Sequence, residues 1–581
     1  MSAKISESPL KNLPTVPPPG NQELLATPFW LLLKRQLIQP ALDGLTRKYT
    51  IGGDEATQDE FLFPPSSADN RQPPAPDNRP LDMPWQFDIG WTNYANVYRD
   101  AVRQQSLWAS TLTDPYAATR EFWPTIANHG FGYNLLFLEQ VSPKPDDRRA
   151  KEFKDLFGNA WTNDMDRLQA AGKLYAIDLR IFEEFSPSTT KSPIRFTPGT
   201  LTLLGQGVDA KADSKALQPM TVRVSSQGRY QIYSASSKAW LYALQAAKTS
   251  ATVYGIWLGH VYHLHIVTGA MLFTFQKSNF PKNHIVYQLL QPRSDYLIGF
   301  DYFLLNIDWT IAPPTSFDTP DKFRQLADRF ASIAIKPNAT GREFFDDDPK
   351  VKIGRQGLKA ENFTRSAKST AWDLYPVAEG LLRIWDIVEN LVNSCVDATY
   401  KKDEDVAKDG HLKTWMNLAA APSPSGGNVR GLPKMNNKKD LKDVLTSLIY
   451  RVTAHGISRL NKSVNPVLTF MANYPPCLQS TEIPKPDEDF TKNTKKLLEM
   501  LPQTRTMGEQ LRFYYVFVFS PPYVPLIPLL GVANDLPFPG GLEDERNKAL
   551  IEFRNQMIAF IHAYDPWVPE QVGQWELNIE T

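Results

Sequence analysis

Apolar residues recur every three or four positions over two long stretches in the second half of the chain. In LLRIWDIVENLV, residues 381–392, the recurring apolar residues are Leu381, Ile384, Trp385, Val388, Leu391 and Val392. In DLKDVLTSLIYRVTAHGISRL, residues 440–460, they are Leu441, Val444, Leu445, Leu448, Ile449 and Val452. Because an α-helix turns by about 100° per residue, this spacing places each set along one face. We therefore predict a buried helix in each stretch.

A shorter section, residues 196–233, has a different pattern. Its segments RFTPGTLTLLG and MTVRVSSQGRYQIY are rich in β-branched and aromatic residues and are interrupted by glycine and proline. These features indicate strands separated by turns. The segment APSPSGGNVRGLP, residues 421–433, has the composition of a surface loop. We predict a mainly α fold in which one large helical domain, residues 91–581, carries a small β insert.

The first 90 residues differ in composition from the rest of the chain. They contain the runs PPP at 17–19, PP at 64–65 and PPAP at 73–76. Proline removes a backbone donor and resists helix interiors. For residues 1–90 we therefore predict a proline-rich arm that packs on the larger body and contains one helix near residues 23–45.

Composition and charge narrow the classes of function. The chain has 581 residues, of which 42% are apolar, and its 63 basic side chains equal its 63 acidic ones. With no net charge to attract polyanions, we expect no nucleic-acid partner and at most peripheral membrane contact. The two cysteines, Cys395 and Cys477, are too few for a disulfide framework or a thiolate metal site. The start MSAKISESPL lacks the apolar run of a secretory signal, so we expect a cytoplasmic protein. We also expect a monomer.

Four of the eight histidines lie within 25 residues, at His260, His263, His265 and His284. The first three form HVYHLH inside an otherwise apolar stretch that is typical of a buried helix. Buried imidazoles need partners, which either a metal ion or a hydrogen-bonded core cluster would provide. On an α-helix His260 and His265 lie about 140° apart, whereas a π-helical turn brings residues i and i+5 onto one side. From the residues alone both interpretations stay open, and for His263 the core interpretation is favoured.

At these residues the sequence resembles the lipoxygenase family. The H-x4-H of His260 and His265 is similar to the first metal-binding pair of that family, which lies on a long central helix with a π-helical section. The stretch PKNHIVYQLLQP, residues 281–292, resembles the family's next motif, although Ile285 and Arg293 replace its proline and its last histidine.

The resemblance continues in the same order from about residue 90 to the end. FGYNLLFLEQVS (131–142) and LYAIDLRIFEEF (174–185) resemble the family's early arched helix and the strand after it. The β segment RFTPGTLTLLG with MTVRV follows in its place. The stretch at 440–460 is similar to the second metal helix and places His455 at the third metal histidine. MANYPP, residues 471–476, then matches the asparagine and prolines that follow that helix.

The resemblance implies a lipoxygenase-like catalytic domain of the single-domain microbial kind, with no N-terminal β-barrel. It implies an enzyme, a non-haem iron dioxygenase with one iron per chain and manganese as the alternative metal. Its substrates would be a polyunsaturated fatty acid and O2. A hydrogen atom leaves a bis-allylic methylene, and O2 adds to the resulting radical to give a hydroperoxide. His260, His265 and His455 would be both the catalytic residues and the metal ligands.

Two further metal ligands are implied by the resemblance, and both depart from the family pattern. Four positions after His455 the chain has Arg459, which has no lone pair to offer a metal. Asn461 is the candidate if the helix carries an insertion, with Ser458 or water as alternatives. Thr581 stands where the family ends in isoleucine, and its main-chain carboxylate is the other candidate, a solvated terminus being the alternative.

Two other positions favour altered chemistry. Ile256 replaces a glutamine that precedes the first metal histidine in many lipoxygenases, and Leu304 falls where a glycine or alanine accompanies the stereochemistry of the product. One alternative is therefore a divergent enzyme of this fold that converts a lipid hydroperoxide or another lipophilic substrate. The other is a non-enzymatic lipid-binding protein on the same scaffold. We assign His284 to a structural role, to a role outside the ligand set, or to neither.

Overall fold

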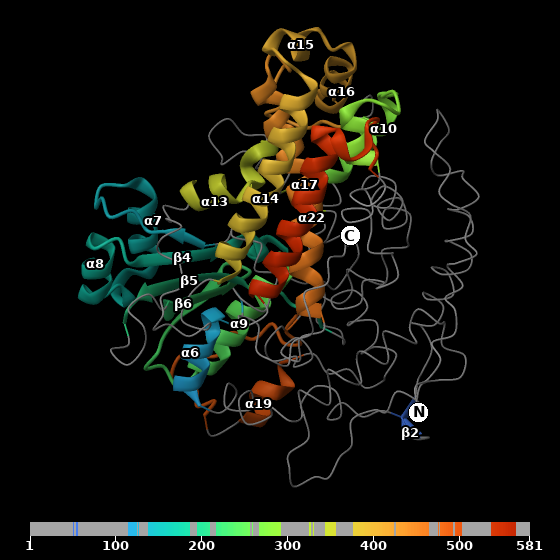
Figure 1. The fold of residues 1–581 in the computed structure, drawn as a ribbon. Helices are drawn as coiled ribbons and strands as arrows, with labels where there is room; N and C mark the ends of the chain where they lie inside the picture. Colours follow the sequence, from blue (N-terminus) through green and yellow to red (C-terminus); the bar gives the residue numbers. More distant parts are fainter. Residues whose placement is uncertain are drawn as a thin grey trace.

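The computed structural model describes a mainly helical protein with a small antiparallel β section, as predicted (Figure 1). The described residues are 50–51, 54–55, 114–124, 126, 138–185, 194–208, 217–255, 258–259, 267–291, 325–326, 329, 343–355, 376–422, 426–463, 475, 477–491, 494–501 and 536–564. The backbone alone is described at 50–51, 54–55, 121, 124, 347, 355, 376–380, 453–463, 494–495, 498, 558 and 561–564. The arm predicted for residues 1–90 lies outside the described residues, apart from the strand pair β1 (Thr50–Ile51) and β2 (Asp54–Glu55).

The larger sheet has five strands that follow one another in chain order, each antiparallel to the next. They are β3 (Leu138–Gln140), β4 (Leu174–Leu179), β5 (Gly199–Gln206), β6 (Leu217–Ser226) and β7 (Arg229–Ser234). The last three confirm the strands predicted within residues 196–233. Between β6 and β7 lie Gln227 and Gly228, whose φ angles of 51° and 74° are both positive, as a two-residue hairpin turn requires.

Of the segment at 131–142, for which the resemblance implies a helix, residues 131–137 lie outside the described residues, and the described part begins with strand β3. Leu138 is fully buried, and β3 pairs with Tyr175, Ala176 and Ile177 of β4. This pairing provides hydrogen bonds for the backbone of β3, so sheet contacts override the local pattern here. The segment at 174–185, predicted as a strand, forms β4 and then the 3-10 helix η8 (Arg180–Phe185).

Each face of the sheet belongs to a different hydrophobic core, because successive side chains of a strand point to opposite faces. One face packs with α7 (Arg148–Phe157) and α8 (Asn163–Ala170), and the other with α6 (Pro115–Pro124) and α9 (Trp240–Val253). The residues that face α7 and α8 are Leu174, Ala176, Leu201 and Leu203. Those of the opposite face are Tyr175, Ile177, Leu204, Val222 and Val224. The sheet therefore fixes the position of α9, which leads to the histidine stretch.

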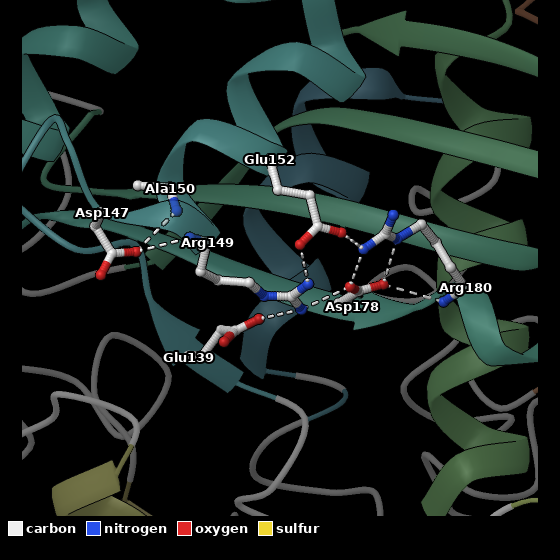
Figure 2. A network of polar contacts seen from close by, with 7 residues as sticks. All are labelled: Glu139, Asp147, Arg149, Ala150, Glu152, Asp178 and Arg180. Atoms are coloured by element: carbon white, nitrogen blue, oxygen red, sulfur yellow. Dashed lines mark hydrogen bonds and ion pairs between the residues drawn. The ribbon is translucent and has the colours of Figure 1, made fainter. Parts of the chain in front are cut away.

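A network of charged side chains ties α7 to the sheet (Figure 2). Arg149 of α7 donates to Glu139 of β3 at 2.8 Å and to Asp178 of β4 at 2.7 Å. Arg180 donates to the same Asp178 at 2.6 Å and to Glu152 at 2.7 Å. Burial by itself raises the pKa of the Asp178 carboxyl, but the two arginines outweigh burial and hold that pKa below its usual range. Both arginines also donate to Glu152, so Asp178 is the more buried of the two carboxylates that they share.

We expect the substitution Glu152→Gln to lower the free energy of unfolding by less than about 1 kcal/mol. The Glu152 side chain is 40% exposed, so water screens its attraction to the two arginines. Urea unfolding of the variant and the wild type measures the difference. A loss above about 2 kcal/mol would instead mean that the five charges act as one cooperative network.

Long helices form the rest of the core. Helix α14 (Pro376–Thr399) packs against α17 (Lys438–Ser463) and α22 (Glu545–Tyr564), and the three lie side by side in Figure 1. Both helices predicted from periodicity are confirmed, since 381–392 lies inside α14 and 440–460 inside α17. Every apolar position on which these predictions were based is buried.

The remaining described helices are short. They are α10 (Gly269–Lys277), α13 (Pro349–Arg355), α15 (Asp403–Lys408), α16 (Gly410–Ala420), α19 (Thr494–Glu499), η7 (Gly158–Ala160), η11 (Phe344–Asp347) and η13 (Gly541–Glu543). The loop predicted at 421–433 has neither helix nor strand among its described residues. No helix in the described part of the chain combines the length and apolarity needed to span a bilayer.

Candidate metal centre

The chain segment that carries the histidine stretch continues from α9 toward α10. All 14 residues of α9 are buried. Beyond α9 the backbone is π-helical at 254–255 and 258–259, and it is π-helical again at 267–268, directly before α10. His260, His263 and His265 themselves lie outside the described residues. The wider helix that the spacing of His260 and His265 requires is therefore present on both sides of them.

Helix α9 contains polar side chains although it is fully buried, and hydrogen bonds hold it in place. The Trp240 indole Nε1 donates to Thr119 Oγ1 of α6 at 2.7 Å. Ser250 Oγ donates to the carbonyl oxygen of Pro198, just before β5, at 2.7 Å. These bonds join α9 to both neighbours, so the helix that precedes the histidine stretch is anchored along its length.

The second metal helix of the prediction is α17. Asn437 caps its start, because the Asn437 side-chain oxygen accepts from the backbone N–H of Asp440 at 2.9 Å. The helix continues without interruption to Ser463 and so includes positions 455, 459 and 461. Of these three residues only the backbone is described. The assignment of His455 and Asn461 as ligands stays a prediction.

One turn before position 455, α17 carries a buried charged cluster. The guanidinium of Arg451 lies 3.5 Å from Asp348 Oδ1, donates to the carbonyl oxygen of Phe344, and stacks 4.2 Å from the centroid of the Phe344 ring. Ser447, one turn earlier, donates to the same Asp348 carboxylate. The cluster joins α17 to the segment formed by η11 and α13. Sequence reasoning missed it, although an arginine in an otherwise apolar helix was the available signal.

His284 lies in a hydrogen-bonded cluster with Asp409 and Tyr400. Its Nδ1 accepts from the backbone N–H of Val286 at 3.1 Å, which leaves Nε2 to donate to Asp409 Oδ2 at 2.9 Å. The Tyr400 hydroxyl donates to the same oxygen at 2.7 Å. Both ring nitrogens of His284 are therefore engaged, which agrees with the structural role, one of the three options that we kept open.

The predicted metal shell has no described side chain. Its five members are His260, His265, His455, Asn461 and Thr581. Ile256 and Leu304, which favoured altered chemistry, also lie outside the described residues. Among the side chains that the structure does describe, no three His, Cys, Asp or Glu residues lie close enough to hold a metal ion. The ligand set therefore stays a prediction that rests on the sequence and on the π-helical backbone around it.

Comparison with known proteins finds matches to the lipoxygenase family. The family model Lipoxygenase matches residues 359–515, a range that contains α17 and position 455. The polyunsaturated fatty acid (12S)/(13S)-lipoxygenase, epidermal-type, of Mus musculus is 20% identical over 298 residues, which are 50% of this chain and 41% of that protein. Hydroperoxide isomerase ALOXE3 of Mus musculus is 24% identical over 191 residues, 30% of this chain and 26% of that protein. The match thus spans less than half the length of either relative.

Solved lipoxygenase structures have the same fold. A lipoxygenase variant crystallised anaerobically with arachidonate superimposes with a TM-score of 0.63, covering 97% of this chain and 83% of that one at 14% identity. A calcium-dependent 11R-lipoxygenase gives 0.62, with 96% and 80% covered at 15% identity. The fungal lipoxygenase of Fusarium graminearum gives 0.60, with 85% and 76% covered at 13% identity.

Proposed function

We propose that this protein belongs to the lipoxygenase family and is a non-haem iron dioxygenase that adds O2 to a polyunsaturated fatty acid to give a hydroperoxide. The observation that carries the proposal is the π-helical backbone on both sides of His260 and His265. A π-helical turn brings residues five apart onto the same side of the helix, so both can bind one metal ion, and such turns are frequent at functional sites. A core cluster of histidines would need no widened helix.

His260, His265 and His455 would hold the iron, with Asn461 and the main-chain carboxylate of Thr581 as further ligands. Neutral imidazoles and a carboxylate form a donor set that suits non-haem iron. When bound, ferric iron would accept the electron, and a hydroxide would accept the proton, that leave the substrate methylene. The protein's own part is to hold the imidazoles fixed and to exclude water, for which the buried helix α9 and the buried face of α17 provide the rigid surroundings.

The substrate class follows from the family. The curated mouse relative is named for polyunsaturated fatty acids, and one structural neighbour holds arachidonate. We propose a fatty acid with at least two cis double bonds separated by one methylene, together with O2. We also propose a monomer in the cytoplasm.

The proposal is tested by metal analysis together with oxygen uptake. Purified wild-type protein is expected to contain about one iron per chain and to consume O2 with linoleate while a conjugated diene forms. Elemental analysis separates iron from manganese, and an oxygen electrode with ultraviolet absorbance follows the reaction. Protein that holds no metal and takes up none from ferrous salt would exclude the dioxygenase and leave a lipid-binding scaffold.

A second candidate function is the isomerisation of a fatty-acid hydroperoxide. The match to the mouse hydroperoxide isomerase favours it, as does Arg459 at the position where the family has a ligand. Linoleate hydroperoxide, supplied without O2, separates the two functions. An isomerase consumes the hydroperoxide at a higher rate than it oxygenates linoleate, and a dioxygenase does the reverse.

A further inference from the structure

Helix α17 places the predicted ligand His455 between two arginines. Ser447, Arg451, His455 and Arg459 follow at intervals of four, so these four positions lie along one side of the helix. Four residues correspond to about 6 Å along the helix axis. A metal cation bound at position 455 would therefore lie close to permanent positive charge, which repels it.

Arg451 is buried, and its charge has a defined partner. The Arg451 and Asp348 side chains are 6% and 7% exposed, and their closest charged atoms lie 3.5 Å apart. Asp348 stands directly before α13 and also accepts from the Ser447 hydroxyl. Both members of the pair are therefore inside the protein, where water and salt screen their charges only weakly.

A contribution to folding alone is a weak explanation for such a pair. Desolvation of two buried ions largely cancels their attraction, so apolar replacements of similar volume are often as stable or more stable. The pair lies one helical turn from a predicted metal ligand, and this position suggests that its role concerns metal binding instead of stability. Removing Asp348 would leave a buried cation one helical turn from position 455.

We propose that Asp348 is the counter-ion that neutralises Arg451 and thereby allows α17 to hold a metal cation at His455. The inference rests on the proposed function, since it requires that the protein bind iron. Asp348 acts here through charge, as a residue outside the ligand set, and it makes no contact with substrate. Substituting either residue should therefore change the affinity for the metal. Loss of Asp348 should weaken metal binding, and loss of Arg451 should not.

The test compares Asp348→Asn with Arg451→Met and Arg451→Lys in the full-length protein. The dissociation constant for Fe2+ is measured anaerobically by competition with a chelator, and stability is measured by urea unfolding. We expect Asp348→Asn to weaken Fe2+ binding by roughly tenfold to a hundredfold. Arg451→Met is expected to bind as tightly as the wild type or more tightly, although both variants lose stability. Arg451→Lys keeps the charge and should bind within about threefold of the wild type.

A purely structural role gives a different pattern, because misplacing the helix weakens metal binding whichever partner is lost. Weaker Fe2+ binding in both Asp348→Asn and Arg451→Met would overturn the inference while the proposed function stands. Wild-type protein that binds no Fe2+ would overturn both. If Asp348→Asn does not fold, the double variant Asp348→Asn/Arg451→Met removes both charges and should bind like the wild type. Binding more than tenfold weaker in the double variant would contradict the charge argument.

Discussion

His265→Ala is expected to lose its iron and to slow the oxygenation of linoleate on the order of a thousandfold. The residue is the second member of the pair whose spacing of five requires a π-helical turn, and alanine leaves that position without a donor. His455→Ala removes the ligand contributed by α17 and should have the same effect. Iron per chain, measured by elemental analysis, and initial rates of O2 uptake are compared with the wild type.

Two other histidines of the same region serve as matched controls. His263 lies between the predicted ligands in sequence, and His284 lies in the cluster with Asp409. His263→Ala and His284→Ala should each retain about one iron per chain, whatever they lose in stability. If His263→Ala lost the metal while His265→Ala kept it, the ligand pair would be His260 and His263, at a spacing that an ordinary α-helix allows.

The sequence predicted those elements whose own pattern decides their structure. The apolar positions of 381–392 and 440–460 are buried in α14 and α17, because a helix with one apolar stripe has one way to bury it. The periodic stretch did not predict where α14 begins and ends. The helix begins at Pro376, five residues before the periodic stretch, where proline is tolerated at a first turn.

Elements that depend on distant partners could not be predicted in the same way. Strand β3 comes from a segment expected to be helical, and its pairing partner β4 begins more than thirty residues later. Likewise, a histidine in sequence gives no indication of what its ring nitrogens contact. The partners of His284 are Tyr400 and Asp409, which are 116 and 125 residues away.

In the candidate site, too, local features could be predicted from the sequence and long-range contacts could not. The spacing of His260 and His265 pointed to a π-helical turn, and π-helical backbone is found on both sides of the pair. The counter-charge of Arg451 was beyond sequence reasoning, because Asp348 is about a hundred residues from Arg451 and has no local pattern to mark it. Long-range charge pairing of this kind is set by tertiary packing.

Asp409→Asn is expected to lower the free energy of unfolding by about 2–4 kcal/mol. Asp409 Oδ2 accepts from His284 and Tyr400, and Oδ1 accepts from the backbone N–H of His411 at the start of α16. An asparagine oxygen can still cap the helix, since asparagine is as good a cap as aspartate. Its amide group, however, turns a donor toward the two donors of His284 and Tyr400. Urea unfolding near neutral pH measures the loss, and Glu404→Gln on the exposed side of α15 should change stability by less than about 0.5 kcal/mol.

The same substitution has a defined pH dependence. Burial by itself raises the pKa of the Asp409 carboxyl, but hydrogen bonds from His284, Tyr400 and the Leu412 backbone outweigh it and hold that pKa well below its usual range. A group whose pKa is lower in the folded protein contributes stability above its unfolded pKa of about 4 and loses that contribution as the pH falls further. The difference in unfolding free energy between wild type and Asp409→Asn should therefore shrink as the pH falls below about 4. A difference that stayed constant into that acid range would mean that Asp409 acts by shape and neutral hydrogen bonds instead of by its charge.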